Sequence, residues 1–218
     1  MHTYPAVTAD IVIFGIDPKE NDLKVCLVQR GIEPFKDQWA IPGGFLRDAI
    51  DNSIEQTAIR EVIEETGLKP EYIQQFKTYS QKDRDPRGRV VSVAFICLIK
   101  SNESLSFSGD ASDSRWFSLK DAMVENLAFD HSSILRDAIT YLRYRLEHEP
   151  IGVHVLPEYF TIPELHKVYE VILDKKIHLS NFHDKILKMN VLHKTEMKKH
   201  GKACRPSAVY RFSDKNRI

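Results

Sequence analysis

Three glutamates lie close together in residues 60–68, which read REVIEETGL. At 100° per residue, Glu61, Glu64 and Glu65 fall within an arc of about 100° on a helix, with Glu61 one turn from both others. Like charges at this spacing destabilise a helix, whereas clustered carboxylate oxygens are the ligands that Mg²⁺ or Mn²⁺ prefers. The segment therefore predicts either a solvated acidic helix face or a divalent metal site.

The surrounding residues favour the metal site over the solvated face, which is the commoner reading of an isolated acidic run. Two glycines precede the expected helix, and Gly67 supplies a C-terminal stop. Apolar residues recur every four positions beside the acids, at Ile54, Ala58 and Val62. We expect the helix to begin near Asn52 or Ser53 and to pack on a folded domain.

Gly43-Gly44 followed by residues 60–68 resembles the Nudix box, G-x5-E-x7-R-E-U-x-E-E-x-G-U, where U is a bulky aliphatic residue. The second half matches at every defined position. In the first half, Asn52 stands where the box has glutamate and Leu46 where it has glycine, which a two-residue insertion after Gly44 would explain. Asp48 or Asp51 could replace the missing acid.

The resemblance implies an α+β fold, a Nudix α/β/α sandwich built on a mixed sheet. It also implies that Glu61, Glu64 and Glu65 hold Mg²⁺ or Mn²⁺ as catalytic residues, with Arg60 orienting the acids. Apolar runs predict the strands of the sheet, and residues 89–99 are apolar enough to be buried on both faces. The expected strands are residues 6–16, 24–31, 39–46, 71–79 and 89–99, with residues 17–22 as a turn.

Residues 83–89 form an expected loop that carries Arg84, Arg87 and Arg89. The loop is either an ordinary solvated hairpin or a clamp in which guanidinium groups bind a diphosphate through paired hydrogen bonds. Residues 78–93 and 112–117 are similar to segments of Nudix proteins that act on ADP-ribose. The predicted ligand-binding residues are Arg30, Gly44, Arg84, Arg87 and Arg89.

The charge changes sign along the chain. Residues 1–150 contain 18 Lys and Arg and 24 Asp and Glu, whereas residues 151–218 contain 13 and 7. We place a domain boundary after residue 149, where residues 149–152 end a helix expected over 132–147. The asymmetry predicts a basic C-terminal domain, residues 150–218, with an anionic partner, after an N-terminal domain of residues 1–149.

The C-terminal domain has the element order of a winged helix-turn-helix. Thr161 and Glu164 form a capping box before one helix, Ser180 is expected to cap a second, and two strands are expected at 191–194 and 208–212 around a basic tip. A solvated basic tail is the alternative, but residues 185–218 combine ten Lys and Arg and two acids with enough apolar residues to fold. Predicted major-groove residues are Asn181, His183, Asp184, Lys185 and Lys188, and predicted phosphate contacts are Lys198, Lys199, Lys202 and Arg205.

A Nudix-like domain followed by this module resembles the Nudix-related transcriptional regulators, the group that includes the NAD-metabolism repressor NrtR and the arabinose regulator AraR. The resemblance extends over nearly the whole chain, including residues 129–131. It implies a homodimer that binds double-stranded operator DNA and senses a nucleoside-diphosphate-sugar or sugar-type effector, most closely ADP-ribose. Helix 132–147 is then the expected connection through which the effector lowers DNA affinity.

A second function remains open, because residues 60–68 also fit an Mg²⁺-dependent hydrolase that splits ADP-ribose or a related compound. No apolar run approaches the roughly 18 to 20 residues of a membrane span, and the N-terminus has no basic stretch followed by an apolar one. We therefore expect a cytoplasmic protein without a membrane partner. Cys26, Cys97 and Cys204 lack C-x-x-C spacing and are expected to be reduced thiols.

Overall fold

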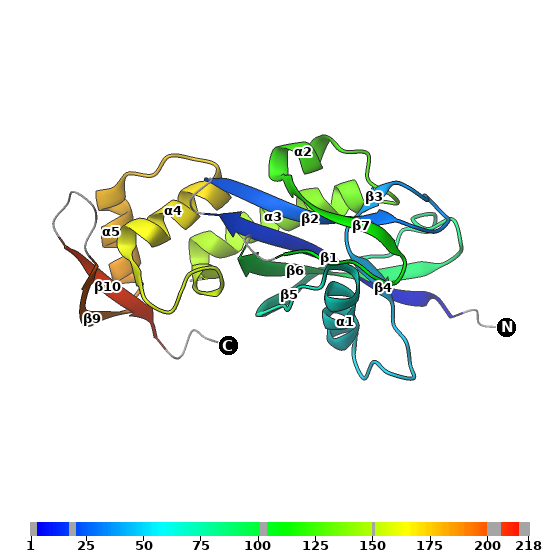
Figure 1. Ribbon diagram of the computed structural model, residues 1–218, viewed down its shortest axis with the longest axis horizontal. Coiled ribbons are helices and arrows are strands. Elements are labelled where there is room, and N and C mark those ends of the chain that lie inside the picture. Colours follow the sequence, from blue (N-terminus) through cyan, green and yellow to red (C-terminus); the bar gives the residue numbers. More distant parts are fainter. Residues whose placement is uncertain (1–3, 18–20, 101–103, 150, 200–205, 214–218) are drawn as a thin grey trace. The chain divides into compact units, whose positions relative to one another are not determined.

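The computed structural model describes residues 4–17, 21–100, 104–149, 151–199 and 206–213 (Figure 1). The chain forms two compact units. The first unit extends through Leu142, apart from a short stretch before Leu23, and the second comprises that stretch and the residues from Arg143 onward. The predicted boundary after residue 149 falls just beyond the helix in which the two units divide.

A mixed sheet forms the centre of the first unit, as predicted. Its path is β3-β2-β1-β6-β5, with β4 added beside β1 and β7 beside β2. Strands β1 and β6 run parallel along their whole length, whereas β5 pairs with β6, and β7 with β2, in antiparallel fashion. The strands are β1 (Ala6–Asp17), β2 (Asp22–Arg30), β3 (Trp39–Ala40), β4 (Gly43–Phe45), β5 (Tyr72–Tyr79), β6 (Val90–Lys100) and β7 (Ala111–Ser118).

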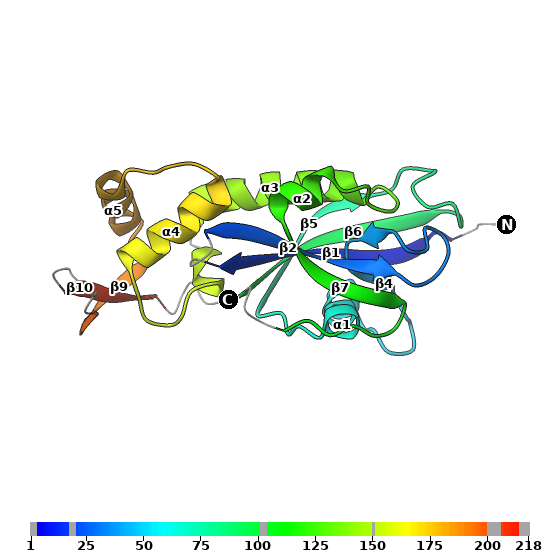
Figure 2. The same cartoon turned by 45° about the horizontal axis from the view of Figure 1, so that its top comes forward.

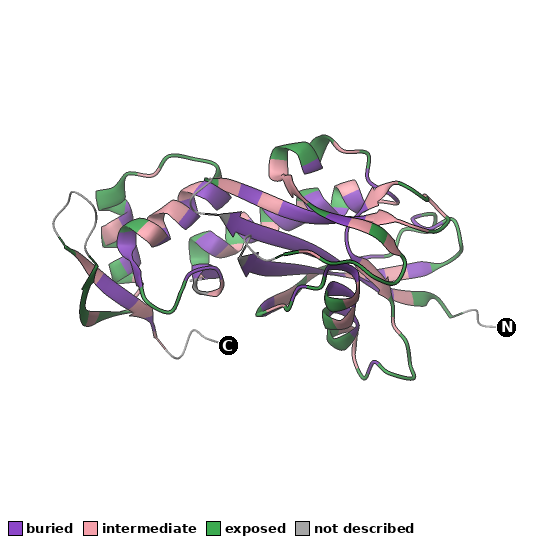
Figure 3. Ribbon diagram, in the orientation of Figure 1, coloured by how far each residue is buried: buried purple, intermediate pink, exposed green. Residues whose placement is uncertain are grey.

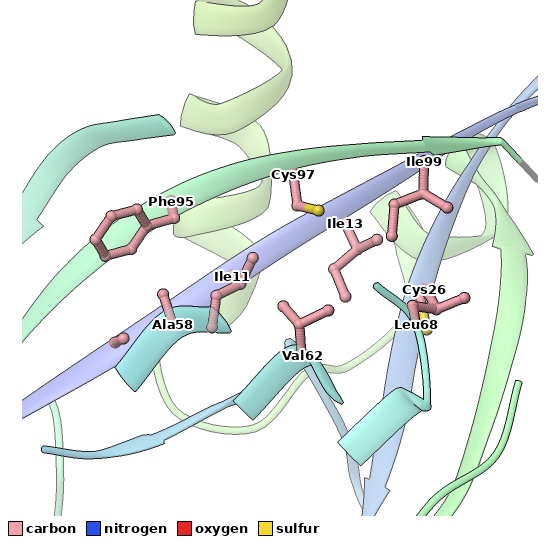
Figure 4. Close-up of a cluster of buried hydrophobic side chains, with 10 residues drawn as sticks. Ile11, Ile13, Cys26, Ala58, Val62, Leu68, Phe95, Cys97 and Ile99 are labelled. Atoms are coloured by element: carbon pink, nitrogen blue, oxygen red, sulfur yellow. The ribbon is translucent and has the colours of Figure 1, made fainter. Parts of the chain in front are cut away.

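Helices cover both faces of this sheet. Helix α1 (Ile54–Thr66) lies on one face, and α2 (Leu119–Val124) and the first part of α3 (His131–His148) lie on the other (Figures 1 and 2). The apolar stripe of α1 packs on β1 and β6 in a buried cluster that includes Ala58, Val62, Ile11 and Phe95 (Figure 4). The layers of the predicted sandwich are therefore present, and α2 is a helix that the sequence pattern did not predict.

Residues 39–46 do not form the single strand that was predicted. They form β3 and β4, which pair with different neighbours, β2 and β1. The break falls at Ile41 and Pro42: the Ile41 N–H donates to the His131 side chain (3.0 Å) rather than to a strand, and Pro42 has no N–H to donate. The chain thus changes partner strands at the point where it passes the start of α3.

The second unit contains a helix pair and a small antiparallel sheet ordered β8-β10-β9. Thr161 and Glu164 form the predicted capping box at the start of α4. Ser180 does not cap α5, contrary to the prediction: the helix begins two residues earlier, at Leu179 after His178, and the Ser180 hydroxyl bonds the His178 ring (2.8 Å). The elements are η1 (Ile151–His154), β8 (Phe160–Thr161), α4 (Ile162–Leu173), α5 (Leu179–Lys188), β9 (Leu192–Lys199) and β10 (Ser207–Phe212).

Strand β9 is longer than predicted and includes Lys198 and Lys199, which were expected at the tip of the hairpin. They pair with Ala208 and Ser207 of β10, so both lysines lie on a strand. The rest of the expected tip, including Lys202 and Arg205, lies outside the described residues.

Buried residues in both units are mainly apolar, and α1 and α5 each bury one side only (Figure 3). Cys26 and Cys97 are buried and are not joined in a disulfide among the described residues, and burial raises the pKa of the Cys26 thiol far above its usual range. Cys204 lies outside the described residues. No helix among the described residues combines the length and the apolar character needed to cross a membrane.

Candidate functional site

Helix α1 is fixed at both ends by the residues that the sequence indicated. The Ser53 side chain accepts the Gln56 N–H at the start of the helix (3.3 Å). At the other end Gly67 adopts a left-handed conformation with φ 71° and donates its N–H to Ile63 O (2.9 Å). Because a side chain is strained at this φ, glycine suits the position, and the acids of α1 are held at a defined point on the sheet.

Arg60 is bound to the loop before the helix by Asp51. Its Nε and Nη2 donate to the two carboxylate oxygens of Asp51 at 3.0 and 2.8 Å, and Nη2 also reaches Phe45 O at 3.0 Å. The Arg60 hydrogen bonds hold the Asp51 pKa well below its usual range despite burial. Of the two acids considered for the altered first half of the box, Asp51 is the one that pairs with Arg60. The side chain of Asn52 instead bonds Gln56 (3.1 Å).

The three glutamates share one side of α1 but occupy different environments. Glu64 is partly exposed and accepts a hydrogen bond from Arg60 (3.2 Å), while Glu61 is buried and also pairs with Arg60. Glu65 is buried and accepts the Gly43 N–H (2.9 Å). Burial, with the charge of Glu61 as a smaller cause, raises the pKa of Glu65 to about 8, and burial also raises the pKa of Glu61 against the effect of Arg60.

Gly44 allows Glu61 to approach the β4 backbone. A Cβ atom on Gly44 would lie 2.2 Å from Glu61 Oε1, a distance that no side chain tolerates. The glycine therefore creates the space that the Glu61 carboxylate occupies, and its role here is steric.

The donor set fits a divalent cation in its chemistry. Glu61 and Glu65 supply hard oxygen atoms and both are buried. A cation would stabilise their ionised carboxylates, which burial and, to a smaller extent, the neighbouring acids disfavour. Within the described residues, however, no three His, Cys, Asp or Glu side chains are already arranged to hold a metal. Instead, the positive charge beside Glu61 and Glu64 is that of Arg60, which forms ion pairs with both.

A pocket in the first unit collects most of the predicted ligand-binding residues. Its walls come from β1, β2, β4, the 83–89 loop and the start of α3. Arg89 is not part of this lining, and its side chain is exposed, while its carbonyl oxygen accepts the Ala6 N–H (3.0 Å). Glu61 and Glu64 do not line it either. The predicted residues that the pocket brings together are Arg30, Gly44, Glu65, Arg84 and Arg87.

Aromatic rings hold two of these arginines. The Arg87 guanidinium lies 4.9 Å from the Phe45 ring centre and 5.5 Å from that of Phe129, and Arg30 lies 4.9 Å from Phe129. Arg87 also donates hydrogen bonds from Nε and Nη2 to the Asp85 carboxylate, at 3.0 and 2.7 Å. Flat cationic and aromatic groups therefore face the same pocket and can stack on a planar ligand group.

A largely buried ionic network adjoins the pocket and shares Asp10 and Arg84 with its lining; its two acids were not predicted. Arg84 donates two hydrogen bonds to Asp130, at 3.0 and 2.6 Å, and one to Asp10, at 3.2 Å. Ser92 donates to the same Asp10 oxygen, Oδ2. One signal was available: Asp10 interrupts the apolar run of residues 6–16, and a buried acid requires partners.

His131 connects this network to β3 and β4. Its Nδ1 accepts the Ile41 N–H, so the ring proton lies on Nε2, which faces Asp10 Oδ1 at 3.9 Å. Burial lowers the pKa of His131, and the charges of Asp10 and Asp130 oppose that effect. A neutral imidazole therefore fixes the position of Ile41 relative to α3.

In the second unit, α5 has one apolar and one polar face. Phe182 and Ile186 are buried beneath the helix, and Phe182 contacts the Tyr169 ring of α4 (4.8 Å between ring centres). The opposite side presents Asn181, Asp184, Lys185 and Lys188 around one shallow depression. Four of the five predicted major-groove residues therefore share one exposed face, and the fifth, His183, is half-buried beside Asp184 (3.5 Å).

The predicted phosphate contacts differ in their surroundings. Lys198 is exposed, whereas Lys199 forms an ion pair with Glu164 of the α4 capping box. Lys199 and Thr161 lower the pKa of Glu164 although its burial acts in the opposite direction. Lys199 therefore already has an anionic partner within the second unit.

Both units match known families. Residues 5–138 match the NUDIX domain, and residues 152–212 match the NrtR DNA-binding winged helix domain. The chain is 32% identical over 210 residues to the ADPR responsive transcriptional repressor NtrR of Acinetobacter baylyi, covering 96% of this chain and 82% of that protein. It is also 37% identical over 145 residues to the ADP-ribose pyrophosphatase of Methanocaldococcus jannaschii, covering 66% of this chain and 78% of the pyrophosphatase.

The fold agrees with the structure of Shewanella oneidensis NrtR complexed with a 27mer DNA. The TM-score is 0.80 at 33% identity, covering 95% of this chain and 93% of that chain. The Nudix domain of the same protein, complexed with ADP ribose, matches with a TM-score of 0.61 at 35% identity, over 65% of this chain and 90% of that one. The similarity thus extends over both units.

Proposed function

Because this chain belongs to the NrtR family of Nudix transcriptional regulators, we propose that it is a DNA-binding regulator that senses ADP-ribose. The second unit binds operator DNA, and the pocket of the first unit binds the effector. The observation that carries the proposal is the grouping of Arg30, Arg84 and Arg87 in one pocket with two aromatic rings.

The pocket has the chemistry of a nucleoside diphosphate site. Guanidinium groups bind phosphate oxygens through paired hydrogen bonds, and Phe45, which is partly exposed, offers a ring face on which a planar base can stack. The family relative named as ADPR responsive and the ADP ribose complex of the Shewanella Nudix domain support ADP-ribose among such ligands. Arg89, outside the pocket, is not part of the proposed site.

The second unit has the chemistry of a major-groove reader. Asn181, Lys185 and Lys188 lie on the exposed face of α5, the second helix of the winged helix module, and side-chain amides and ammonium groups bind base edges in the major groove. Lys198 on β9 reaches phosphates. A regulator of this kind binds as a homodimer to a palindromic site with half-sites about one DNA turn, roughly 34 Å, apart. We propose that it acts in the cytoplasm, where it meets this partner.

The proposal is tested with a labelled duplex from the region upstream of its own gene and a random duplex of equal length, each titrated at moderate salt with and without ADP-ribose. We expect preference for the upstream duplex, and an affinity that ADP-ribose lowers by about 5- to 150-fold, the usual range of coupling. AMP serves as the control, since it lacks the second phosphate and the terminal ribose. Equal affinity for both duplexes contradicts the regulator, and an unchanged dissociation constant with ADP-ribose contradicts the sensor.

Hydrolysis of ADP-ribose to AMP and ribose 5-phosphate is a second candidate function, favoured by the intact segment 60–68 and by the similarity to an ADP-ribose pyrophosphatase. Glu61 and Glu65, with Glu64, would hold Mg²⁺ or Mn²⁺, which when bound supplies water activation and charge neutralisation. Arg60, fixed by Asp51, orients Glu61 and Glu64. Wild type and Glu64→Gln are compared for AMP release with Mg²⁺, and equal release from the two contradicts hydrolysis at this site.

A further inference from the structure

We propose that Asp130 transmits occupancy of the pocket to helix α3 through its pair of hydrogen bonds with Arg84. A diphosphate that takes hydrogen bonds from Arg84 weakens the contact with Asp130 and so releases the start of the helix. This inference rests on the proposed function and assigns its regulation to one ion pair.

Arg84 lies between the pocket and the helix. Its side chain is only 4% exposed, and it lines the pocket together with Asp10. Asp130 does not line the pocket, although both of its carboxylate oxygens accept hydrogen bonds from Arg84. One buried guanidinium therefore faces a ligand site on one side and the residue before α3 on the other.

A diphosphate has to compete for its arginines in this pocket. Arg87 is held by Asp85, and Arg84 by Asp10 and Asp130, while the Arg30 side chain donates to the carbonyl oxygens of Pro34 (2.7 Å) and Ile32 (3.4 Å). A diphosphate that contacts Arg84 adds negative charge beside Asp10 and Asp130, and repulsion between these anions weakens the carboxylate contacts of the shared guanidinium. Asp10 is fixed within β1 and also accepts a hydrogen bond from Ser92, whereas the Asp130 side chain is 23% exposed and precedes α3, so Asp130 is the partner that can move.

The residues on both sides of Asp130 belong to the pocket wall. Phe129 stacks with Arg30 and Arg87, and His131 accepts the Ile41 N–H. Three consecutive residues thus attach the start of α3 to the pocket, each through a different contact. A ligand that rearranges the arginines acts on this attachment directly.

Helix α3 continues from the pocket into the second unit. It is one uninterrupted helix whose residues through Leu142 belong to the first unit and whose residues from Arg143 belong to the second. There Arg143 donates from Nε to Ile172 O of α4 (2.9 Å). A ligand can change DNA affinity only through an element that differs between two states, and α3 is covalently part of both units.

Asp137 offers a matched control on the same helix. It also binds the sheet through its carboxylate, accepting hydrogen bonds from Lys77 (2.6 Å) and the Tyr79 hydroxyl (2.7 Å) of β5. None of these three residues lines the pocket. Asp130→Asn and Asp137→Asn therefore make the same chemical change at two attachments of α3, one to Arg84 of the 83–89 loop and one to β5, and only the first involves a pocket arginine.

The experiment measures ADP-ribose binding and operator binding of the full chain for wild type, Asp130→Asn and Asp137→Asn. We expect wild type and Asp137→Asn to lose about 5- to 150-fold in DNA affinity with saturating ADP-ribose. We expect Asp130→Asn to bind ADP-ribose within a few-fold of wild type. Its DNA affinity, however, should change by no more than about twofold when saturating ADP-ribose is added. By reciprocity, DNA should lower the ADP-ribose affinity of wild type by the same factor, and that of Asp130→Asn hardly at all.

Asparagine and serine are both favoured before a helix, so Asp130→Asn and a second variant, Asp130→Ser, retain a helix-capping group while removing the ion pair. Melting temperatures identify any variant that fails to fold. A full ADP-ribose response in both folded Asp130 variants overturns this inference alone. A wild-type protein that binds no operator, or no ADP-ribose, overturns the proposed function and this inference with it.

Discussion

Charged residues are organised in opposite ways in the two units. In the pocket of the first unit, Arg84 is buried, held by two carboxylates and fixed in orientation before any ligand arrives. On α5 of the second unit, Lys185 and Lys188 are exposed around an open depression. The first arrangement suits a small ligand recognised by geometry, and the second suits a polyanion attracted by charge and recognised at its base edges.

The difference predicts which substitutions disturb folding and which disturb binding alone. Removing one member of a buried ionic network leaves an uncompensated charge in the protein interior, whereas removing an exposed ammonium leaves only water. Stability and DNA affinity should therefore respond to different residues.

The largest effect is expected for Arg84→Met. It leaves Asp10 and Asp130 without their common partner, and breaking a buried pair costs about 3–5 kcal/mol of unfolding free energy. Lys185→Met, the same substitution type on the exposed face, should change stability by no more than about 0.5 kcal/mol. Urea unfolding of both variants measures the difference in unfolding free energy. Equal losses would show that burial of the charged side chain does not determine the cost of its removal.

The second-largest effect is expected for Asp51, whose contribution to the free energy of unfolding depends on pH. Asp51→Asn should cost about 1.5–3 kcal/mol at pH 7, because hydrogen bonds from a charged guanidinium are lost. The Arg60 hydrogen bonds lower the folded-state pKa of Asp51, so its contribution to stability is complete above its unfolded pKa of about 3.9 and is lost as pH falls below it.

Urea midpoints between pH 3 and 7 test this sign: the difference between wild type and Asp51→Asn should shrink toward low pH. Asp48→Asn, at an exposed position of the same loop, is the control and should follow wild type throughout. A difference that grows toward acid would contradict the assignment of Asp51 as the partner of Arg60.

The third effect lies in DNA recognition. Asn181→Ala should lower the preference for the operator over random duplex by about 1–3 kcal/mol, the contribution of one good base contact, while the melting temperature stays unchanged. Competition binding with the two duplexes measures the ratio. If operator and random duplex weaken equally, Asn181 contacts the backbone rather than a base.

The smallest effect should separate two neighbouring lysines. Lys198→Ala removes an exposed charge and should weaken binding to all duplexes by roughly fivefold at 0.15 M salt, with a salt slope reduced by about 1. Lys199→Ala should weaken binding less, because its ammonium already pairs with Glu164, and should cost no more than about 1 kcal/mol of stability. Identical salt slopes for the two variants would contradict the prediction that Lys198 contributes more to DNA binding than Lys199.

Local signals in the sequence were sufficient for much of the fold. The acids on one side of α1, the start of the helix near Ser53 and the Gly67 stop depend on residues within a few positions of one another, and the structure has them as predicted. The same holds for the Thr161 capping box. Such features follow from helix geometry and do not depend on the rest of the chain.

Long-range contacts were beyond the sequence pattern. Asp10 and Arg84 are 74 residues apart, and no periodicity connects them. The break between β3 and β4 depends on His131, which is 90 residues from Ile41. Likewise, the choice of Asp51 over Asp48 as the partner of Arg60 depends on the path of the loop before α1. These contacts determine the pocket, which is why Asp10 and Asp130 were missed.

Phe129 gives the start of α3 a property that its hydrogen bonds do not reveal. Its φ of 53° is left-handed, which costs a residue with a side chain about 1–2 kcal/mol and is incompatible with a right-handed helical turn. Helix α3 therefore cannot extend backward through Phe129 without a change in the backbone conformation of that residue. If the contact between Asp130 and Arg84 is weakened as we propose, lengthening of the helix through Phe129 cannot take up the change, and the expected response is a shift of α3 itself.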